Sequence, residues 1–140
     1  MDLPGVIVFF DAECLLCNRS VQWLLETDQQ GRLAFAPLSG ETAATLREGK
    51  VLREEHLGGK SMVLTEREDG EWTVLQRSDA VIRALEISGA GSVRLRFLKL
   101  LPRFLRELGY RLVARTRYVV FGRTEACLIP DEKTTGRILP

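Results

Sequence analysis

The chain opens with an unbroken apolar run, followed by a segment of helical periodicity. Residues 5–10, GVIVFF, hold β-branched and aromatic side chains without alternation, which is typical of a strand buried on both faces. A helix is predicted from about Cys14 to Thr27, with Gly31 as its left-handed cap. Its apolar residues share one face: Leu16, Val21, Leu24 and Leu25. The run RLAFAPL, residues 32–38, predicts a second strand, parallel to the first through a right-handed crossover.

After this unit the pattern becomes weaker. Ser39 is expected to cap a short helix that ends at Gly49. Residues 50–60 have little periodicity and contain a glycine pair, so they are expected to form a loop.

A hairpin and another helix come next. SMVLTE and EWTVLQR, residues 61–66 and 71–77, are strand-like runs separated by REDG, which predicts an antiparallel hairpin. Ser78 is expected to cap a helix that ends at Gly89. The order of elements predicts an α/β fold with a mixed sheet between helical layers.

Helical periodicity returns from Ser92, and Pro102 is expected to kink or divide this segment. Leucines recur at three or four residues: Leu95, Leu98, Leu101, Leu105, Leu108 and Leu112. From Arg115 the chain is expected to be irregular, with four residues contacting the core: Tyr118, Phe121, Cys127 and Ile129.

The length of 140 residues fits a single domain with one core. We predict a core in residues 1–89 and a basic helical extension with a tail in residues 90–140, packed on that core. No apolar run approaches the roughly 20 residues that span a bilayer. The N-terminus has an acid at Asp2 and a short apolar run, unlike a secretory signal. A cytoplasmic location is therefore expected.

Charge is distributed unevenly. Residues 92–123 carry nine basic side chains and one acid, Glu107, for a net charge of +8, while the rest of the chain carries −7. We expect an amphipathic segment whose leucines face the core and whose arginines face solvent; weak contact with an anionic membrane surface or an acidic protein is the alternative. No helix-turn-helix, zinc-finger or aromatic-interleaved pattern favours nucleic acid.

The candidate chemistry lies in FFDAECLLCNRS, residues 9–20. Cys14 and Cys17 form a CxxC at a helix start, where the helix dipole and unpaired N–H groups favour a thiolate. We expect Cys14 at the exposed edge as the attacking thiol, and Cys17 one turn further in, more buried, as the resolving thiol. The two intervening residues, Leu15 and Leu16, are apolar and are expected, with Asn18 and Arg19, to shape the site or to contact substrate.

Charged neighbours act in both directions on this site. Asp11 and Glu13 oppose a thiolate, and Arg19 would offset them if it turns toward the sulfur. Asp11 could accept a proton from Cys17 or could cap the helix, and the sequence leaves both open.

Other uses of the cysteines are weighed against redox chemistry. Cys14, Cys17, His56 and Cys127 would make a Cys₃His zinc site, but only one close-spaced pair exists, so no metal is expected. The thiols could also be small core residues. Cys127 lies in the apolar ACLIP and is expected to be a buried thiol, with a third redox partner as the alternative. No nucleotide-binding loop is present, and no cofactor is expected.

Several ordered motifs carry a family resemblance: Asp11, Cys14, Cys17 and Asn18; RLAFAPL; Asp69, Gly70 and SDA at residues 78–80; and YVVFGRTEACLIP, residues 118–130. In these the chain resembles the DCC family of thiol-disulfide oxidoreductases, which is thioredoxin-like. The resemblance implies a thioredoxin-like three-layer fold with a C-terminal helical extension, in which Asn18 shapes the site beside Asp11. It implies dithiol–disulfide exchange with a protein disulfide or a small thiol, and a separate reductant.

One departure from thioredoxins is visible. Thioredoxins place a cis-proline just before the third strand, facing the CxxC, and residues 60–62 contain no proline. The backbone that contacts substrate is therefore expected to differ. The competing class is a non-catalytic binding module that docks through its basic C-terminal helices.

Overall fold

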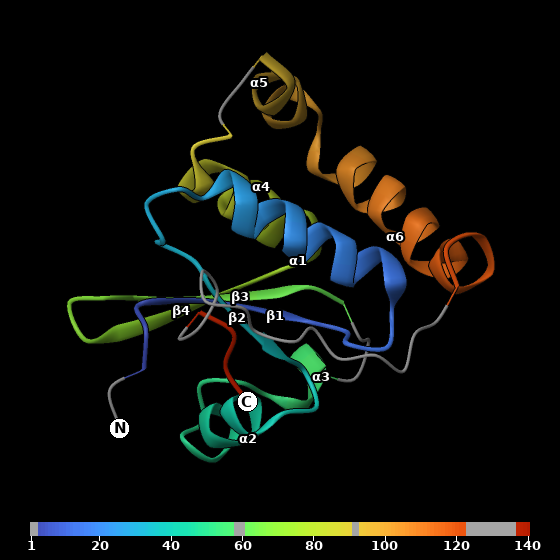
Figure 1. Cartoon of the computed structure of the whole chain (residues 1–140). Helices are drawn as coiled ribbons and strands as arrows, with labels where there is room; N and C mark the ends of the chain where they lie inside the picture. The colour runs from blue at the N-terminus through green and yellow to red at the C-terminus, as the bar shows by residue number, and fades with distance from the viewer. Residues whose placement is uncertain (1–2, 58–60, 91–92, 123–136) are drawn as a thin grey trace.

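A four-stranded mixed sheet forms the centre of the protein (Figure 1). The computed structural model describes residues 3–57, 61–90, 93–122 and 137–140. The strand order is β2-β1-β3-β4, with these bounds: β1 (Val6–Phe10), β2 (Ala34–Pro37), β3 (Val63–Glu68) and β4 (Glu71–Gln76). Strands β1 and β2 are parallel, and the other two pairs are antiparallel. The predicted parallel pair and the predicted hairpin are confirmed.

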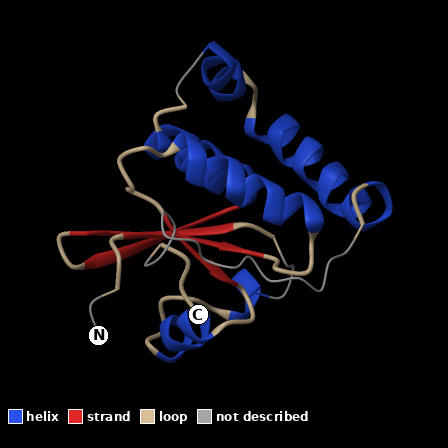
Figure 2. Cartoon of the chain, viewed as in Figure 1, coloured by secondary structure: helices blue, strands red, loops and turns tan. Residues whose placement is uncertain are grey.

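Helices cover both faces of this sheet and add a further layer on one side (Figures 1 and 2). On one face lie α1 (Leu15–Thr27) and α4 (Arg77–Ser88), and on the other α2 (Glu41–Glu48) and α3 (Glu54–Leu57). Outside α1 and α4 lie α5 (Val93–Leu100) and α6 (Arg103–Val120). This mixed α/β architecture is consistent with the predicted thioredoxin-like fold.

Strand β1 is buried on both faces, as its unbroken apolar run predicts. Because successive side chains of a strand point to opposite faces, Val8 and Phe10 enter the cluster under α1 and α4. Ile7 and Phe9 enter a second cluster with Leu46 of α2. The strand thus joins the two halves of the core.

The two-residue turn between β3 and β4 follows directly from its sequence. Asp69 and Gly70 both have positive φ angles, 51° and 86°, the conformation of a type I′ hairpin turn. Arg67 and Glu68, expected in the turn, belong to β3 and pair with β4. The left-handed residue predicted at Gly31 is also present, with φ 64°, although α1 already ends at its C-cap Asp28.

Three local expectations were wrong. The N-cap of α2 is Gly40 and not Ser39. Helix α4 begins at Arg77, so Ser78 lies inside its first turn, and its hydroxyl donates to the Glu107 carboxylate of α6 at 2.5 Å. The expected loop at 50–60 contains the short helix α3. The Ser78 hydroxyl thus binds Glu107, which is distant in sequence, and does not cap its own helix.

The C-terminal helices differ most from expectation. Pro102 separates α5 from α6, as predicted. However, α6 continues to Val120, so residues 115–120 are not irregular. Of the leucine repeat only Leu95 is buried, while Leu101, Leu105, Leu108 and Leu112 are exposed. The expectation that the leucines face the core was wrong for α6.

The last four residues add to the edge of β2. Ile138 forms a parallel bridge with Phe35, and the Arg137 guanidinium binds the buried Asp28 carboxylate at 2.6 Å. These contacts cover backbone groups that an edge strand would otherwise expose. Within the described ranges, no helix is both long enough and apolar enough to cross a membrane.

Candidate functional site

Helix α1 starts at the first cysteine of the CxxC. Cys14 has extended backbone angles, φ −90° and ψ 119°, and its Sγ accepts the N–H of Cys17 at 3.3 Å. The thiol therefore acts as the helix N-cap, a role usually taken by an oxygen side chain. The Asp11 carboxylate accepts the N–H of Glu13 at 3.0 Å, before the helix begins. The interpretation of Asp11 as the helix cap was wrong.

The burial of the two thiols is the reverse of what we expected. Cys14 is completely buried, whereas Cys17 is partly exposed and lines a cavity. The residues after α6 reach the start of α1, where the N–H of Leu15 donates to the Gly122 carbonyl at 3.4 Å. Both thiols are free. Sequence periodicity could not reveal this contact because Gly122 is distant along the chain.

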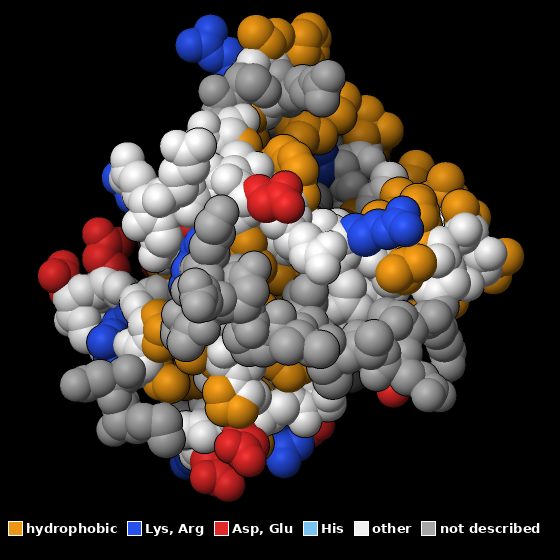
Figure 3. All heavy atoms as spheres, in the orientation of Figure 1, with side chains coloured by type: hydrophobic (Ala, Val, Ile, Leu, Met, Phe, Trp, Pro, Cys, Tyr) orange, Lys and Arg blue, Asp and Glu red, His pale blue; other side chains and the backbone are white. Residues whose placement is uncertain are grey.

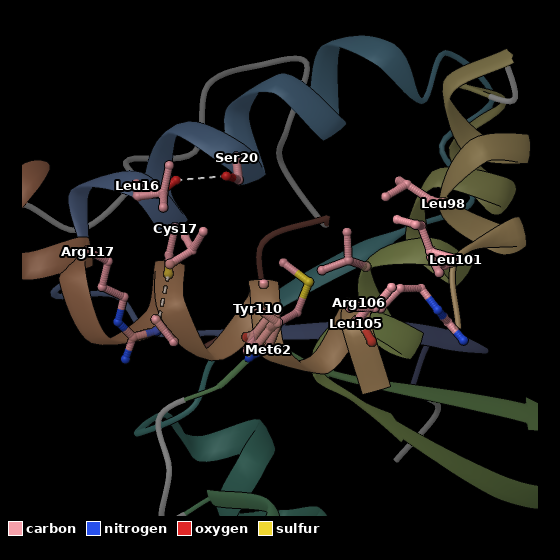
Figure 4. Close-up of a pocket in the computed structure, with 16 residues that line it drawn as sticks. Leu16, Cys17, Ser20, Met62, Leu98, Leu101, Leu105, Arg106, Tyr110 and Arg117 are labelled. Atoms are coloured by element: carbon pink, nitrogen blue, oxygen red, sulfur yellow. Dashed lines mark hydrogen bonds between the residues drawn. The ribbon is translucent and has the colours of Figure 1, made fainter. Parts of the chain in front are cut away.

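The surroundings of Cys17 disfavour its thiolate. Burial, a hydrogen bond with Cys14 and the negative charge of Cys14 together raise the pKa of Cys17 to about 12, and the positive charge of Arg117 opposes this rise. The Arg117 Nη1 lies 4.0 Å from the Cys17 Sγ (Figure 4). Cys17 is therefore a protonated thiol at neutral pH.

A buried ionic cluster lies next to the Cys17 thiol. Arg117 Nη2 lies 3.4 Å from Asp11 Oδ2 and 3.3 Å from the Tyr118 hydroxyl, which itself donates to Asp11 Oδ2. Arg117 and Asp11 are both almost fully buried. The cation beside the CxxC is thus Arg117 and not Arg19, whose side chain is exposed.

The remaining predicted site residues have structural contacts. Asn18 is buried, and its Nδ2 donates to the carbonyls of Ala12 and Cys14 at 2.8 and 3.1 Å, which ties the loop after β1 to α1. Leu16 lines the same cavity as Cys17, and Leu15 is half-buried. Whether these residues contact a substrate stays a prediction.

The cavity beside Cys17 lies between α1, α4, α5 and α6 (Figure 4). Its volume is about 460 Å³, within the range of small-molecule sites. Most of its lining is apolar, and it includes Leu16, Met62, Ile82, Leu98, Leu105 and Val113. Polar groups enter it from Ser20, Ser78, Arg106 and Arg117.

The segment before β3 also borders this cavity. Met62 directly precedes β3, and its N–H donates to the Tyr110 hydroxyl at 2.8 Å. Burial raises the pKa of Tyr110, so its hydroxyl keeps its proton at neutral pH. The Tyr110 side chain of α6 therefore binds a backbone N–H that borders the same cavity as Cys17.

The described members of the zinc set considered above, Cys14, Cys17 and His56, do not form a metal-binding group. The described ranges contain no group of three or more histidine, cysteine or acidic side chains that could hold a metal ion. His56 lies on α3, and its Nδ1 accepts the N–H of Arg53 at 2.9 Å. Cys127, considered as a ligand or third thiol, lies outside the described residues, as does Ile129.

Sequence reasoning missed Arg117 as the cation beside Cys17, and Tyr110. A signal was present: Arg106, Tyr110 and Arg117 recur at helical spacing and lie on one face of α6. The leucine repeat on the opposite face is longer, and apolar periodicity is normally the better guide to burial.

A mixed four-stranded sheet, with two free thiols at the start of the helix after β1, is consistent with a thioredoxin-like fold. Residues 8–123 match the model of the DCC1-like thiol-disulfide oxidoreductase family, and the chain belongs to this family.

Two relatives are similar over most of the chain. The chain is 28% identical over 139 residues to "Uncharacterized protein YuxK" of Bacillus subtilis (strain 168), which covers 99% of this chain and 96% of that protein. It is 30% identical over 124 residues to "DCC family protein At1g52590, chloroplastic" of Arabidopsis thaliana, covering 86% of this chain and 67% of the relative. No solved structure matches.

Proposed function

We propose that the chain catalyses dithiol–disulfide exchange through Cys14 and Cys17, with a protein disulfide or a low-molecular-weight disulfide as substrate. One observation carries the proposal: two free thiols lie within one turn at the N-terminus of α1, where the Cys14 sulfur accepts a helix N–H. A helix N-terminus stabilises negative charge, which a thiol needs in order to attack.

The first step forms a mixed disulfide. The Cys14 thiolate attacks one sulfur of the substrate disulfide, the substrate S–S bond breaks, and the other substrate sulfur leaves as a thiolate. Since Cys14 is buried, the substrate sulfur must displace the groups that cover it. Cys17 is the weaker first nucleophile because its raised pKa keeps it protonated.

The second step releases the substrate. Cys17 loses its proton and attacks the Cys14 sulfur, which leaves a Cys14–Cys17 disulfide and a fully reduced substrate. Once Cys14 is in the mixed disulfide it carries no charge, so two of the causes that raise the pKa of Cys17 disappear. Arg117 stays beside the sulfur and favours its thiolate. A separate thiol reductant then regenerates the dithiol.

We infer that Asp11 acts mainly through Arg117. Its Oδ2 holds the guanidinium that lies beside Cys17, and a buried carboxylate in this position could also accept the proton that Cys17 loses. An Asp11→Asn variant separates these roles. A proton acceptor predicts a loss of exchange rate that varies between about pH 6 and about pH 9, whereas a positioning role predicts a uniform loss.

Trapping the mixed disulfide tests the proposed order of attack. The Cys17→Ser variant should accumulate a stable adduct on Cys14 when mixed with oxidised glutathione, detected by mass spectrometry. The Cys14→Ser variant should react far more slowly at neutral pH, since burial, the largest cause that raises the pKa of Cys17, remains in this variant. An adduct that forms only on Cys17 would reverse the order. A wild-type pair that does not cycle in a glutathione redox buffer would contradict the exchange activity.

The second candidate function is a binding module that docks through α5 and α6. The exposed leucines of α6 favour docking by these helices. Docking and thiol chemistry use different residues, so one does not exclude the other.

A further inference from the structure

The outward surface of α5 and α6 is apolar. Phe104, Leu108 and Leu112 follow one another at four-residue spacing on α6, a stripe that faces away from the sheet. The outward residues of the two helices are largely exposed: Leu100 at 80%, Phe104 at 71%, Leu108 at 60%, Leu112 at 65% and Val119 at 87%. Hydrophobic side chains gather over these helices (Figure 3). Single exposed leucines are common, but a continuous stripe marks an interaction surface.

Polar contacts fix α6 in this orientation. On its inward face, Arg106 Nη1 lies 3.3 Å from Asp79 Oδ1, the Tyr110 hydroxyl accepts the Met62 N–H, and Arg117 pairs with Asp11. Rotating the helix to bury its leucines would break all three contacts. The apolar stripe is therefore a property of the folded chain, and among the residues that the structure describes none covers it.

Exposed positive charge lies beside this stripe. Residues 93–122 carry eight basic side chains and one acid, Glu107, and four of the basic ones pair with acids of other elements: Lys99, Arg103, Arg106 and Arg117. The Glu107 carboxylate is turned inward to Ser78 and Arg77. Arg111 and Arg115 are exposed and follow Leu108 and Leu112 by three residues, so each lies beside the stripe.

We propose that this face of α5 and α6 binds the surface of an anionic lipid bilayer. Apolar side chains on the outward face would enter the headgroup boundary, and the flanking arginines would meet anionic headgroups. A second copy of the chain fits less well, because a symmetric contact would bring two strongly basic faces together. Leu101, Leu105 and Val113 belong both to this exposed surface and to the cavity wall. The apolar surface is therefore continuous with the cavity that contains Cys17.

Vesicle co-sedimentation of the full chain tests the proposal. Binding is expected to vesicles of phosphatidylcholine with about 30% phosphatidylglycerol at low salt, and much weaker binding to phosphatidylcholine alone. Removing two charges with Arg111→Gln and Arg115→Gln should weaken binding on the order of thirtyfold, since each basic side chain near the surface contributes a similar factor. The pair Leu108→Gln and Leu112→Gln should reduce binding at least as strongly.

Matched controls lie elsewhere on the chain. Arg32→Gln with Arg53→Gln removes two exposed charges outside α5 and α6, and Trp23→Gln removes an exposed apolar side chain of α1; both should bind as the wild type does. Circular dichroism checks that every variant is folded. A Cys14→Ser and Cys17→Ser double variant should also bind normally, which separates lipid binding from thiol chemistry.

Three outcomes would overturn the proposal. The first is equal binding to neutral and anionic vesicles. The second is no binding to either vesicle by folded protein. The third is a concentration-dependent dimer that the Leu108→Gln and Leu112→Gln pair converts to monomer, because the face would then belong to a second copy.

Discussion

Arg117 near the end of α6 and Asp11 just after β1 form a buried ion pair, although 106 residues separate them in sequence. The pair joins the outer helical layer to the loop that leads into the CxxC. It also places a positive charge 4.0 Å from the Cys17 sulfur. The C-terminal helix is thus part of the site and not an appendage.

Replacing Arg117 with methionine should destabilise the reduced protein strongly. The substitution leaves the Asp11 carboxylate buried without its cation, which typically costs roughly 3–5 kcal/mol. Urea denaturation of the variant and the wild type measures this loss. Arg111→Met, an exposed change on the same helix, is the control and should stay within about 0.5 kcal/mol. If both variants are equally stable, the ion pair contributes nothing.

The stability of the reduced protein should fall as pH rises from about 9 toward about 12. Cys17 has a pKa of about 12 when folded, raised chiefly by burial from an ordinary value of 9.0. Between these values the unfolded chain releases the proton and the folded chain keeps it, so higher pH favours unfolding. Below about pH 9 both states are protonated and the contribution is fully present.

The difference in unfolding free energy between wild type and Cys17→Ser reports the titration of Cys17 together with its interaction with Cys14. Denaturation under reducing conditions at several pH values measures it. A difference that stays constant through this window would contradict the raised pKa of Cys17.

Removing the Tyr110 hydroxyl should loosen the segment before β3. Tyr110→Phe leaves the Met62 N–H without the acceptor that it now has at 2.8 Å, and an unsatisfied buried donor costs about 1–3 kcal/mol. Hydrogen exchange of the Met62 amide should become faster, while amides in the middle of β1 should change little. Phe104→Leu on the exposed face is the control. Unchanged exchange at Met62 would mean that this hydrogen bond is not formed in solution.

Two glycine substitutions should have opposite effects. A Cβ at Gly40 would lie 2.8 Å from both the Pro140 carbonyl carbon and the Pro37 Cγ, so Gly40→Ala should destabilise the protein and displace the last residues from β2. A Cβ at Gly109, inside α6, meets nothing within 4 Å. Gly109→Ala should stabilise the protein by about 0.5–1 kcal/mol through helix propensity. Thermal unfolding of both variants measures the difference, and a stabilised Gly40→Ala would contradict the close packing of the C-terminus.

Local sequence features determined most of the secondary structure. The apolar run of β1, the Asp69–Gly70 turn and the break at Pro102 each depend on the conformational preferences of a few neighbouring residues. The start of α1 at the CxxC could also be predicted, because the helix pattern begins there. The CxxC spacing singled out the two cysteines, the order of elements predicted the α/β class, and the family resemblance implied the thioredoxin-like fold.

The environment of those cysteines was decided by tertiary structure. Sequence spacing placed Cys14 at a helix start, but the folded chain buries it completely. Likewise, spacing suggested Arg19 as the nearby cation, and the fold supplies Arg117 instead. Such contacts depend on how separate elements pack, which the periodicity of one element does not specify.

Helix α6 shows which features the sequence determined and which the tertiary structure decided. The sequence by itself determined helical periodicity with leucines recurring on one side. The structure extends this helix to Val120 and shows Arg106, Tyr110 and Arg117 on the other side. Only the tertiary structure decided which side faces inward, since Asp79, the Met62 N–H and Asp11 offer this helix buried polar partners. A buried polar group without a partner is costly, so these contacts determine the orientation and leave the leucines on the surface.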